Sequence, residues 1–134
     1  MTTDLRLFDI TLDATGDHTN DQYKGVFATS SDASGEFAVV EALGARAIGV
    51  LQDKSTAAGI PSLIRVAGIT KMQAGASSVM PTAIIEGDVV SLSSVGQAIF
   101  SSASGTANIG TALESLATDS TGIIKVLLGV GLTT

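Results

Sequence analysis

Residues 46–72 read RAIGVLQDKSTAAGIPSLIRVAGITKM, and this stretch decides the fold. It opens on the apolar run Ala47–Leu51, crosses a polar segment from Gln52 to Pro61, and returns through the apolar run Leu63–Ile69. Apolar runs rich in β-branched residues, separated by a loop containing Gly, Pro, Asp and Ser, are typical of two antiparallel strands. The stretch therefore predicts a β-hairpin.

A second, weaker copy of this pattern lies near the C-terminus. There Asn108–Leu113 leads into Glu114–Gly122, and the chain returns through Ile123–Leu128. In both copies Ile-Gly opens the first run, and a basic residue followed by Val lies in the second, as Arg65-Val66 and Lys125-Val126. Two similar hairpins predict a small all-β body built from repeated units.

The rest of the chain offers further short strands separated by turns of Gly, Ser and Asp. The candidates are Leu5–Leu12, Tyr23–Thr29, Glu36–Leu43, Ile85–Leu92 and Gln97–Phe100. Two of them are ambiguous, since Leu5–Leu12 also fits a helical face and Glu36–Leu43 contains helix formers. In the turn before Val89, Gly87 can take a positive φ and Asp88 can hydrogen-bond the local backbone.

This pattern predicts a mainly β fold, a small single-domain β-sandwich or barrel with short hairpins and an N-terminal arm. At most one or two short helical turns are expected, one of them in Pro81–Glu86. We expect residues 1–20 to form the arm and residues 21–134 the β-rich domain.

The composition limits the size of the core. Hydrophobic residues make up 45% of the 134 residues, yet aromatic residues are only 4% and Trp is absent. Small aliphatic side chains must therefore supply most of the buried area, at roughly 25 cal/mol per Å². Such a core gives modest stability alone, and oligomerisation is a common remedy.

The charge of the chain argues against several classes of partner. The net charge is −6, and the seven Lys and Arg residues are spread singly along the sequence. Nucleic-acid binding needs clustered basic residues, so neither nucleic acid nor an anionic membrane is expected as a partner. Cysteine is absent, no apolar run reaches the roughly 20 residues that span a bilayer, and no export signal is expected.

No set of residues predicts an enzyme. His18 is the only histidine, and in a polar turn we expect it to be a solvated residue. The acidic segment Asp13–Asp21 lacks the spacing of a calcium loop. Glu86 and Asp88 flank Gly87, where carboxylates more often cap the backbone or face water than transfer protons. We expect no catalytic residues, no cofactor and no metal.

Two groups of residues are candidates for binding other proteins. The apolar residues of the N-terminal segment could add a strand to the chain's own sheet, to a sister subunit or to a different protein; they are Leu5, Leu7, Phe8, Ile10 and Leu12. An ordinary internal edge strand is the alternative. Arg65 and Lys125 could pair with acids on a neighbouring subunit, or could be exposed strand charges that discourage edge aggregation.

Four pieces of this sequence, in order, resemble phage capsid decoration (cement) proteins. They are Ala47–Lys54 (AIGVLQDK), Ile64–Lys71 (IRVAGITK), Glu86–Val90 (EGDVV) and Ile109–Glu114 (IGTALE). The resemblance spans Tyr23–Leu128, about four fifths of the chain, and fails at Leu5–Leu12 and Ser77–Thr82.

The resemblance implies a β-rich structural protein, often trimeric, on the outer surface of an icosahedral phage head. It implies a role similar to the lambda-type decoration protein, at three-fold or quasi-three-fold positions, bound to the major capsid protein and made in the host cytoplasm. Other readings stay open: a head-fibre or tail module of the virion, a small ligand-binding or enzymatic β-barrel, and a secreted adhesin-like domain.

Overall fold

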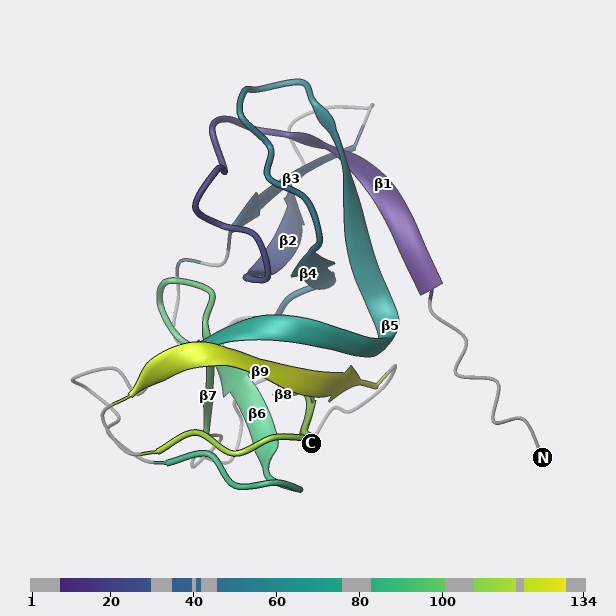
Figure 1. Ribbon diagram of the computed structural model, residues 1–134. Coiled ribbons are helices and arrows are strands. Elements are labelled where there is room, and N and C mark those ends of the chain that lie inside the picture. Colours follow the sequence, from purple (N-terminus) through teal and green to yellow (C-terminus); the bar gives the residue numbers. More distant parts are fainter. Residues whose placement is uncertain are drawn as a thin grey trace.

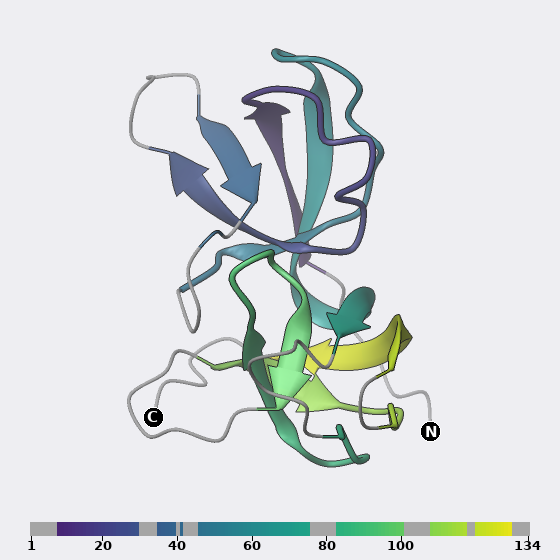
Figure 2. The same cartoon turned by 90° about the vertical axis from the view of Figure 1, so that its left-hand side faces the viewer.

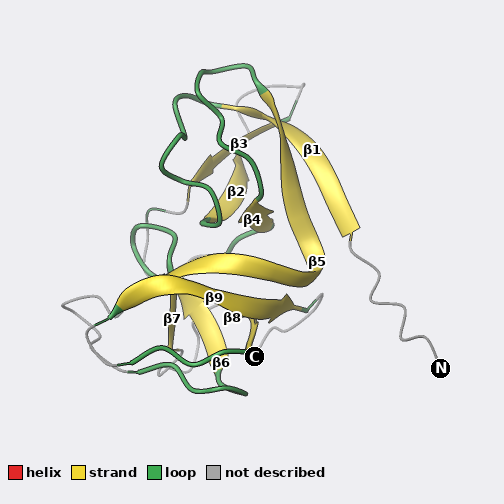
Figure 3. Ribbon diagram, viewed as in Figure 1, coloured by secondary structure: helices red, strands yellow, loops and turns green. Residues whose placement is uncertain are grey.

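The computed structural model describes residues 8–29, 35–39, 41, 46–75, 83–100, 108–117 and 120–129. These residues form strands and loops with no helix (Figure 3), so the predicted mainly β fold is confirmed. The strands are β1 (Phe8–Ala14), β2 (Gly25–Thr29), β3 (Glu36–Val39), β4 (Gly49–Leu51), β5 (Pro61–Gly75), β6 (Val89–Leu92), β7 (Ala98–Phe100), β8 (Asn108–Ala112) and β9 (Thr121–Leu128).

The strands close into two small barrels that share β5. In the first barrel the order is β1-β3-β2-β4-β5, and β5 pairs back to β1. In the second the order is β5-β7-β6-β8-β9, and β9 pairs back to β5. Figures 1 and 2 show the two barrels as separate lobes, with the long strand β5 passing from one to the other. The predicted barrel architecture is confirmed, and both predicted hairpins are present as β4–β5 and β8–β9.

The second barrel repeats the first, strand for strand. In the first, β1 runs parallel to β3 and every other pair is antiparallel. In the second, β5 runs parallel to β7 and every other pair is again antiparallel. Strand β5 is therefore the last strand of one unit and the first of the next. The repeat that the two hairpins indicated extends over the whole described fold.

The Ile-Gly of each hairpin marks equivalent positions in the two barrels. A Cβ atom on Gly49 would lie far inside contact distance of the carbonyl oxygen of Arg65, and one on Gly110 would do the same to Leu127. Only glycine lets the two backbones approach this closely. The two glycines are thus required where β4 pairs closely with β5 and where β8 pairs closely with β9.

This correspondence corrects one detail of the sequence comparison. Arg65 occupies the place of Leu127, because both carbonyls lie against the equivalent glycine. The backbone N–H of Gln52 donates to Leu63 O at 2.9 Å, and the backbone N–H of Leu113 donates to Lys125 O at 2.8 Å. Lys125 is therefore the equivalent of Leu63, and aligning it with Arg65 was wrong.

The turn into the second strand of each barrel is also repeated. The amide of Lys24 donates to Asp21 O at 3.0 Å, and the amide of Asp88 donates to Ile85 O at 2.9 Å. The residue before each donor has a positive φ, 69° at Tyr23 and 92° at Gly87. The predicted conformation of Gly87 is confirmed, and so is the role of Asp88, whose carboxylate accepts from the amide of Ile85 at 2.8 Å.

The helical turn expected in Pro81–Glu86 is not formed in the described part of that segment, residues 83–86. There Ile84 makes an isolated β-bridge with Leu116, and its two backbone hydrogen bonds fix an extended conformation. The equivalent bridge of the first barrel joins His18 to Ser55. Pro81 and Thr82 lie outside the described residues.

Strand β5 bends where it leaves the first barrel. Its residues up to Ala67 pair with β1, and its residues from Gly68 pair with β9. Gly68 has a φ of 100°, which a residue with a side chain rarely adopts. Figure 1 shows the start of β1 and the end of β9 at the outside of this corner.

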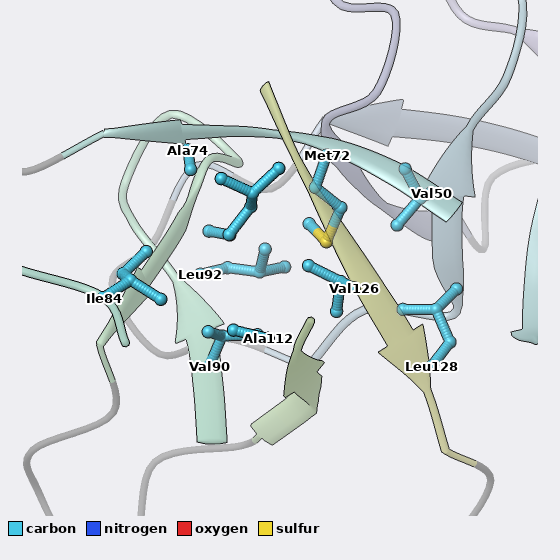
Figure 4. Packing of buried hydrophobic residues seen from close by; sticks show 11 residues of the cluster. Val50, Met72, Ala74, Ile84, Val90, Leu92, Ala112, Val126 and Leu128 are labelled. Carbon is cyan, nitrogen blue, oxygen red and sulfur yellow. The ribbon is translucent and has the colours of Figure 1, made fainter. Parts of the chain in front are cut away.

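Each barrel has its own apolar core. The first is small and consists of Ala14, Val26, Phe37, Leu51 and Ile64, with Ile10, Leu12, Val39 and Ile48 packed against it. The second consists of Val50, Met72, Ala74, Ile84, Val90, Leu92, Ala98, Ala112, Ile124, Val126 and Leu128. In Figure 4, Met72 and Val126 point toward Leu92 across the second barrel. Val50 belongs to this core although β4 is a strand of the first barrel, so the second core extends to a strand of the first barrel.

Candidate functional site: the interaction surfaces

The N-terminal candidates lie on a strand that docks on the chain's own sheet. Strand β1 pairs with β5 from Phe8 opposite Ala67 to Asp13 opposite Pro61. Ile10 and Leu12 pack against the core of the first barrel. Phe8 is 58% exposed, at the outside of the corner in β5. Leu5 and Leu7 lie outside the described residues.

Arg65 fastens β1 to β5 by an ion pair within the chain. Its Nε donates to Asp9 Oδ1 at 2.9 Å and its Nη2 donates to Asp9 Oδ2 at 3.2 Å. Its third contact is from Nη1 to Ile69 O at 3.1 Å, across the bend of β5. A two-pronged arginine–carboxylate contact fixes geometry as well as charge. A contact of Arg65 with another subunit stays a prediction.

Lys125 lies on the outer face of the second barrel, directly opposite Lys71 of β5. Its Nζ is 3.7 Å from Glu114 Oε1, in a pair that is largely exposed on both sides. In the part of the chain that the structure describes, Lys71 has no carboxylate within 4.0 Å. A contact of Lys125 with another subunit likewise stays a prediction.

Apolar side chains flank this lysine pair on the same face. Ile69 lies opposite Leu127, and Gln73 lies opposite Ile123. Leu127 is 37% exposed and Ile123 is 54% exposed. We call the outer face formed by Ile69, Lys71, Gln73, Ile123, Lys125 and Leu127 the lysine face.

A pocket of about 290 Å³ adjoins the lysine face at the junction of the barrels. Its lining consists of Tyr23, Gln52, Arg65, Ile69, Thr70, Lys71 and Lys125. Three of these residues are cations and none is an acid, in a chain with a net charge of −6. Because Arg65 is paired with Asp9 and Lys125 has an exposed contact with Glu114, the positive charge at the pocket comes mainly from Lys71 and in part from Lys125.

The expectation that His18 is solvated is wrong. Its side chain is only 11% exposed, and its ring centroid lies 5.2 Å from that of Phe37. Nδ1 donates to Asp21 Oδ2 at 2.9 Å, and Nε2 lies 3.2 Å from Thr15 Oγ1. His18 thus closes the end of the first barrel, where it has a packing role.

Asp21 is the centre of this loop, with Lys24 Nζ at 2.9 Å and His18 Nδ1 at 2.9 Å. Burial raises the pKa of Asp21, but hydrogen bonds from Lys24 and His18 together lower it by more, so the pKa lies below its usual value of 3.8. A carboxylate with a lowered pKa stabilises the fold above its unfolded pKa and loses that effect as the pH falls through the folded value.

We therefore expect Asp21→Asn to lower the free energy of unfolding by about 1 kcal/mol at pH 7, a value reduced by solvent screening of this partly exposed group. The difference from the wild type should shrink as the pH falls below about 4, because Asp21 is then protonated in the unfolded state, and it should vanish below the lowered folded pKa, where both states are protonated. Urea unfolding of both proteins at a series of pH values measures this. A constant difference down to pH 2 would contradict the assigned role.

The pKa of Asp17 is also lowered, although its side chain is fully exposed. The side-chain and backbone hydrogen bonds of Thr19 lower the pKa of Asp17 below its usual value. Both donors lie in the same turn, with Thr19 Oγ1 at 2.6 Å and Thr19 N at 2.9 Å from Asp17 Oδ1. The acidic turn is thus organised by its own hydrogen bonds.

The described ranges contain no group of three residues arranged as metal ligands. Those same ranges contain no helix that is long and apolar enough to cross a membrane. What stands out in the geometry is a pair of exposed faces, one around Phe8 and one around the lysine pair.

The described residues therefore form a double β-barrel whose candidate sites are exposed faces. The family model described as "Phage cement protein" matches residues 18–128, which include most of both barrels. The chain belongs to the phage cement protein family and is a structural protein of the phage virion. This confirms the resemblance drawn from the four sequence pieces.

Solved structures share the fold, and one of them is the N base of head fiber gp8.5 in bacteriophage phi29, with a TM-score of 0.64 at 17% sequence identity, over 92% of this chain and 95% of that one. No curated protein matches the sequence.

The sequence did not indicate Lys71 as a site residue. The exposure of Ile123, Lys125 and Leu127, which alternate with buried residues along β9, follows from the two-residue period of a strand. The pairing of β9 with the second half of β5 joins distant parts of the chain, and only that register brings Lys71 opposite Lys125.

Proposed function

We propose that the protein cements the phage head: it binds the outer surface of the icosahedral capsid as a homotrimer at three-fold or quasi-three-fold positions and joins neighbouring major-capsid subunits. The observation that carries this proposal is the family match over residues 18–128. The net charge of −6 suits a protein kept apart from the packaged nucleic acid.

The mechanism is added interface. Each contact across a seam between capsid subunits buries surface that must be exposed again before the shell opens, and a stable interface buries roughly 1,600 Å². Three linked contacts per trimer give high avidity from modest individual affinities. The role is structural, and no catalytic step is part of it.

The N-terminal segment, residues 1–20, is one proposed attachment. Because Ile10 and Leu12 pack against the protein's own core, the capsid contact falls to Leu5, Leu7 and the exposed Phe8. In an exchanged arrangement, β1 would occupy the same place on a sister subunit, with Ile10 and Leu12 filling that subunit's core.

A head-fibre component is the second candidate. The fold likeness to the N base of a phage head fiber favours it. Such a component would also attach to the head, but it would extend away from the surface without joining capsid subunits. Capsids with and without the protein would then be equally resistant to heat.

Two truncations separate attachment from folding. Removing residues 1–7 leaves β1 intact, so we expect a folded protein whose co-sedimentation with purified empty heads falls at least tenfold. Removing residues 1–20 takes β1 from β5 and opens the first barrel, so we expect an unfolded product. Circular dichroism and sedimentation measure both.

Wild-type binding by the 1–7 truncation would rule out a contact through Leu5 and Leu7, and wild-type binding by the same truncation with Phe8→Ala would rule out the N-terminal contact altogether. A wild-type protein that fails to bind heads, or bound heads that break at the same temperature as bare ones, would rule out the cementing function itself.

A further inference from the structure

We propose that the lysine face and its adjoining pocket form a second docking surface, which takes a carboxylate-bearing surface of the capsid shell protein. This inference rests on the proposed function and names the chemistry of the partner. It starts from the pairing of Lys71 with Lys125, which lie directly opposite each other on β5 and β9. Like charges at directly opposed positions destabilise a sheet.

The equivalent strand pair of the first barrel, β1 with β5, can be compared with the pair β5 and β9 that contains the two lysines. There the outward pairs between β1 and β5 are Asp9 with Arg65, Thr11 with Leu63 and Asp13 with Pro61. No like charges meet, and Asp9 and Arg65 neutralise each other. The repeated architecture therefore does not require two opposed lysines, and stability within the chain gives no reason for them.

The charges around the pocket are left for a partner to neutralise. The described Lys and Arg residues are Lys24, Arg46, Lys54, Arg65, Lys71 and Lys125. Three of these line the pocket, which contains no acid. Arg65 is matched by Asp9, whereas Lys125 has only an exposed contact at 3.7 Å with Glu114. Lys71 has no carboxylate within 4.0 Å among the described residues.

The apolar flanks of the lysine pair supply area for burial. Ile123 and Leu127 are exposed on either side of Lys125 along β9. A partner that places carboxylates over the lysines would cover these side chains, in the usual arrangement of apolar contacts around charge pairs that set register.

Charge complementarity selects the occupant. Two copies of this face brought together would oppose four lysines, so self-association through it is disfavoured. Nucleic acid needs a longer basic track than two lysines and one paired arginine supply. A carboxylate-bearing protein surface matches both the lysines and the apolar flanks, and under the proposed function the shell protein is the partner that would present it.

The single substitution Lys71→Glu tests the proposal, because it should move stability and binding in opposite directions. It replaces a like-charge pair by an opposite-charge pair, so we expect Tm to rise by about 1–4 °C. It also places a carboxylate where the partner's carboxylate must lie, so co-sedimentation with purified empty heads should fall at least tenfold. A merely structural role would move both in the same direction.

The matched control is a charge reversal elsewhere on the surface. Arg46→Glu makes the same change in net charge at an exposed position that lines neither this pocket nor the neighbouring one at Gln73 and Ile123, and its binding to heads should stay within about twofold of the wild type. The double variant Lys71→Gln, Lys125→Gln should also bind weakly, and the wild-type binding should weaken with salt more steeply than that of this variant.

Each contrary result has a distinct meaning. Full binding by Lys71→Glu, with wild-type protein bound to heads, overturns the docking surface and leaves the cementing function standing. A fall in oligomer size on analytical ultracentrifugation shows that the face joins sister subunits, and equal loss of binding in Arg46→Glu shows a general charge effect. Either result overturns the proposal, and failure of the wild type to bind overturns both.

Discussion

Gly49→Ala is expected to lower the free energy of unfolding by about 3 kcal/mol or more, near the upper end of what a single added methyl group costs. The new Cβ would overlap the carbonyl oxygen of Arg65, a backbone atom that pairing between β4 and β5 holds in place. Flexible side chains can move aside, but here a strand must shift. Thermal unfolding followed by circular dichroism should show Tm lowered by roughly 10 °C.

Two other glycines make this prediction specific. Gly110→Ala should cost a similar amount, because its Cβ would meet the carbonyl oxygen of Leu127 in the same way. Gly16→Ala makes the same chemical change where nothing lies within 4 Å, and Tm should change by no more than about 2 °C. If Gly49→Ala and Gly16→Ala had equal effects, the close backbone approach would not exist.

The sequence predicted the parts of the fold that are local. Each hairpin joins neighbouring runs of the chain, and the strand period and the loop residues between the runs carry enough information to place it. The turn before β6 was predicted from Gly87 and Asp88 in the same way. The repeat was visible through Ile-Gly, because backbone contact there tolerates only glycine. The alignment of Arg65 with Lys125 was wrong. An exposed basic residue is under no comparable constraint and can occupy any of several outward positions.

Closure of the barrels could not be read from local pattern. The pairings of β5 with β1 and with β9 join segments far apart in sequence, and the change of partner occurs at Gly68, one glycine among several. The pairing of Lys71 with Lys125 could not be predicted for the same reason, because it depends on the long-range register of β5 with β9. His18 was misjudged for a related reason: its polar neighbours in sequence suggested solvent, whereas Phe37 and Asp21 approach it only in the fold.

Shared use of β5 has a consequence for unfolding, which truncation of each core would reveal. Phe37 is fully buried in the first barrel and Met72 is fully buried in the second. Phe37→Ala should cost about 3–5 kcal/mol and Met72→Ala about 2–5 kcal/mol, from lost burial and the cavity left behind. Ile85→Ala, at a side chain that is largely exposed, is the control and should cost less than about 0.5 kcal/mol.

We expect both core variants to unfold in a single transition in which the two barrels lose structure together. When one barrel opens, half of β5 loses its partners, and Val50 withdraws from the core of the other barrel. The amide of Gly25 also loses its bond to Gly96 O, 2.8 Å away in the other lobe. Hydrogen exchange measured on peptides from β3 and β8 should therefore accelerate by the same factor in Phe37→Ala. Acceleration in β3 alone would show that the barrels are independent units joined only by a strand, and a cement protein of that kind could yield at one lobe while the other stayed attached.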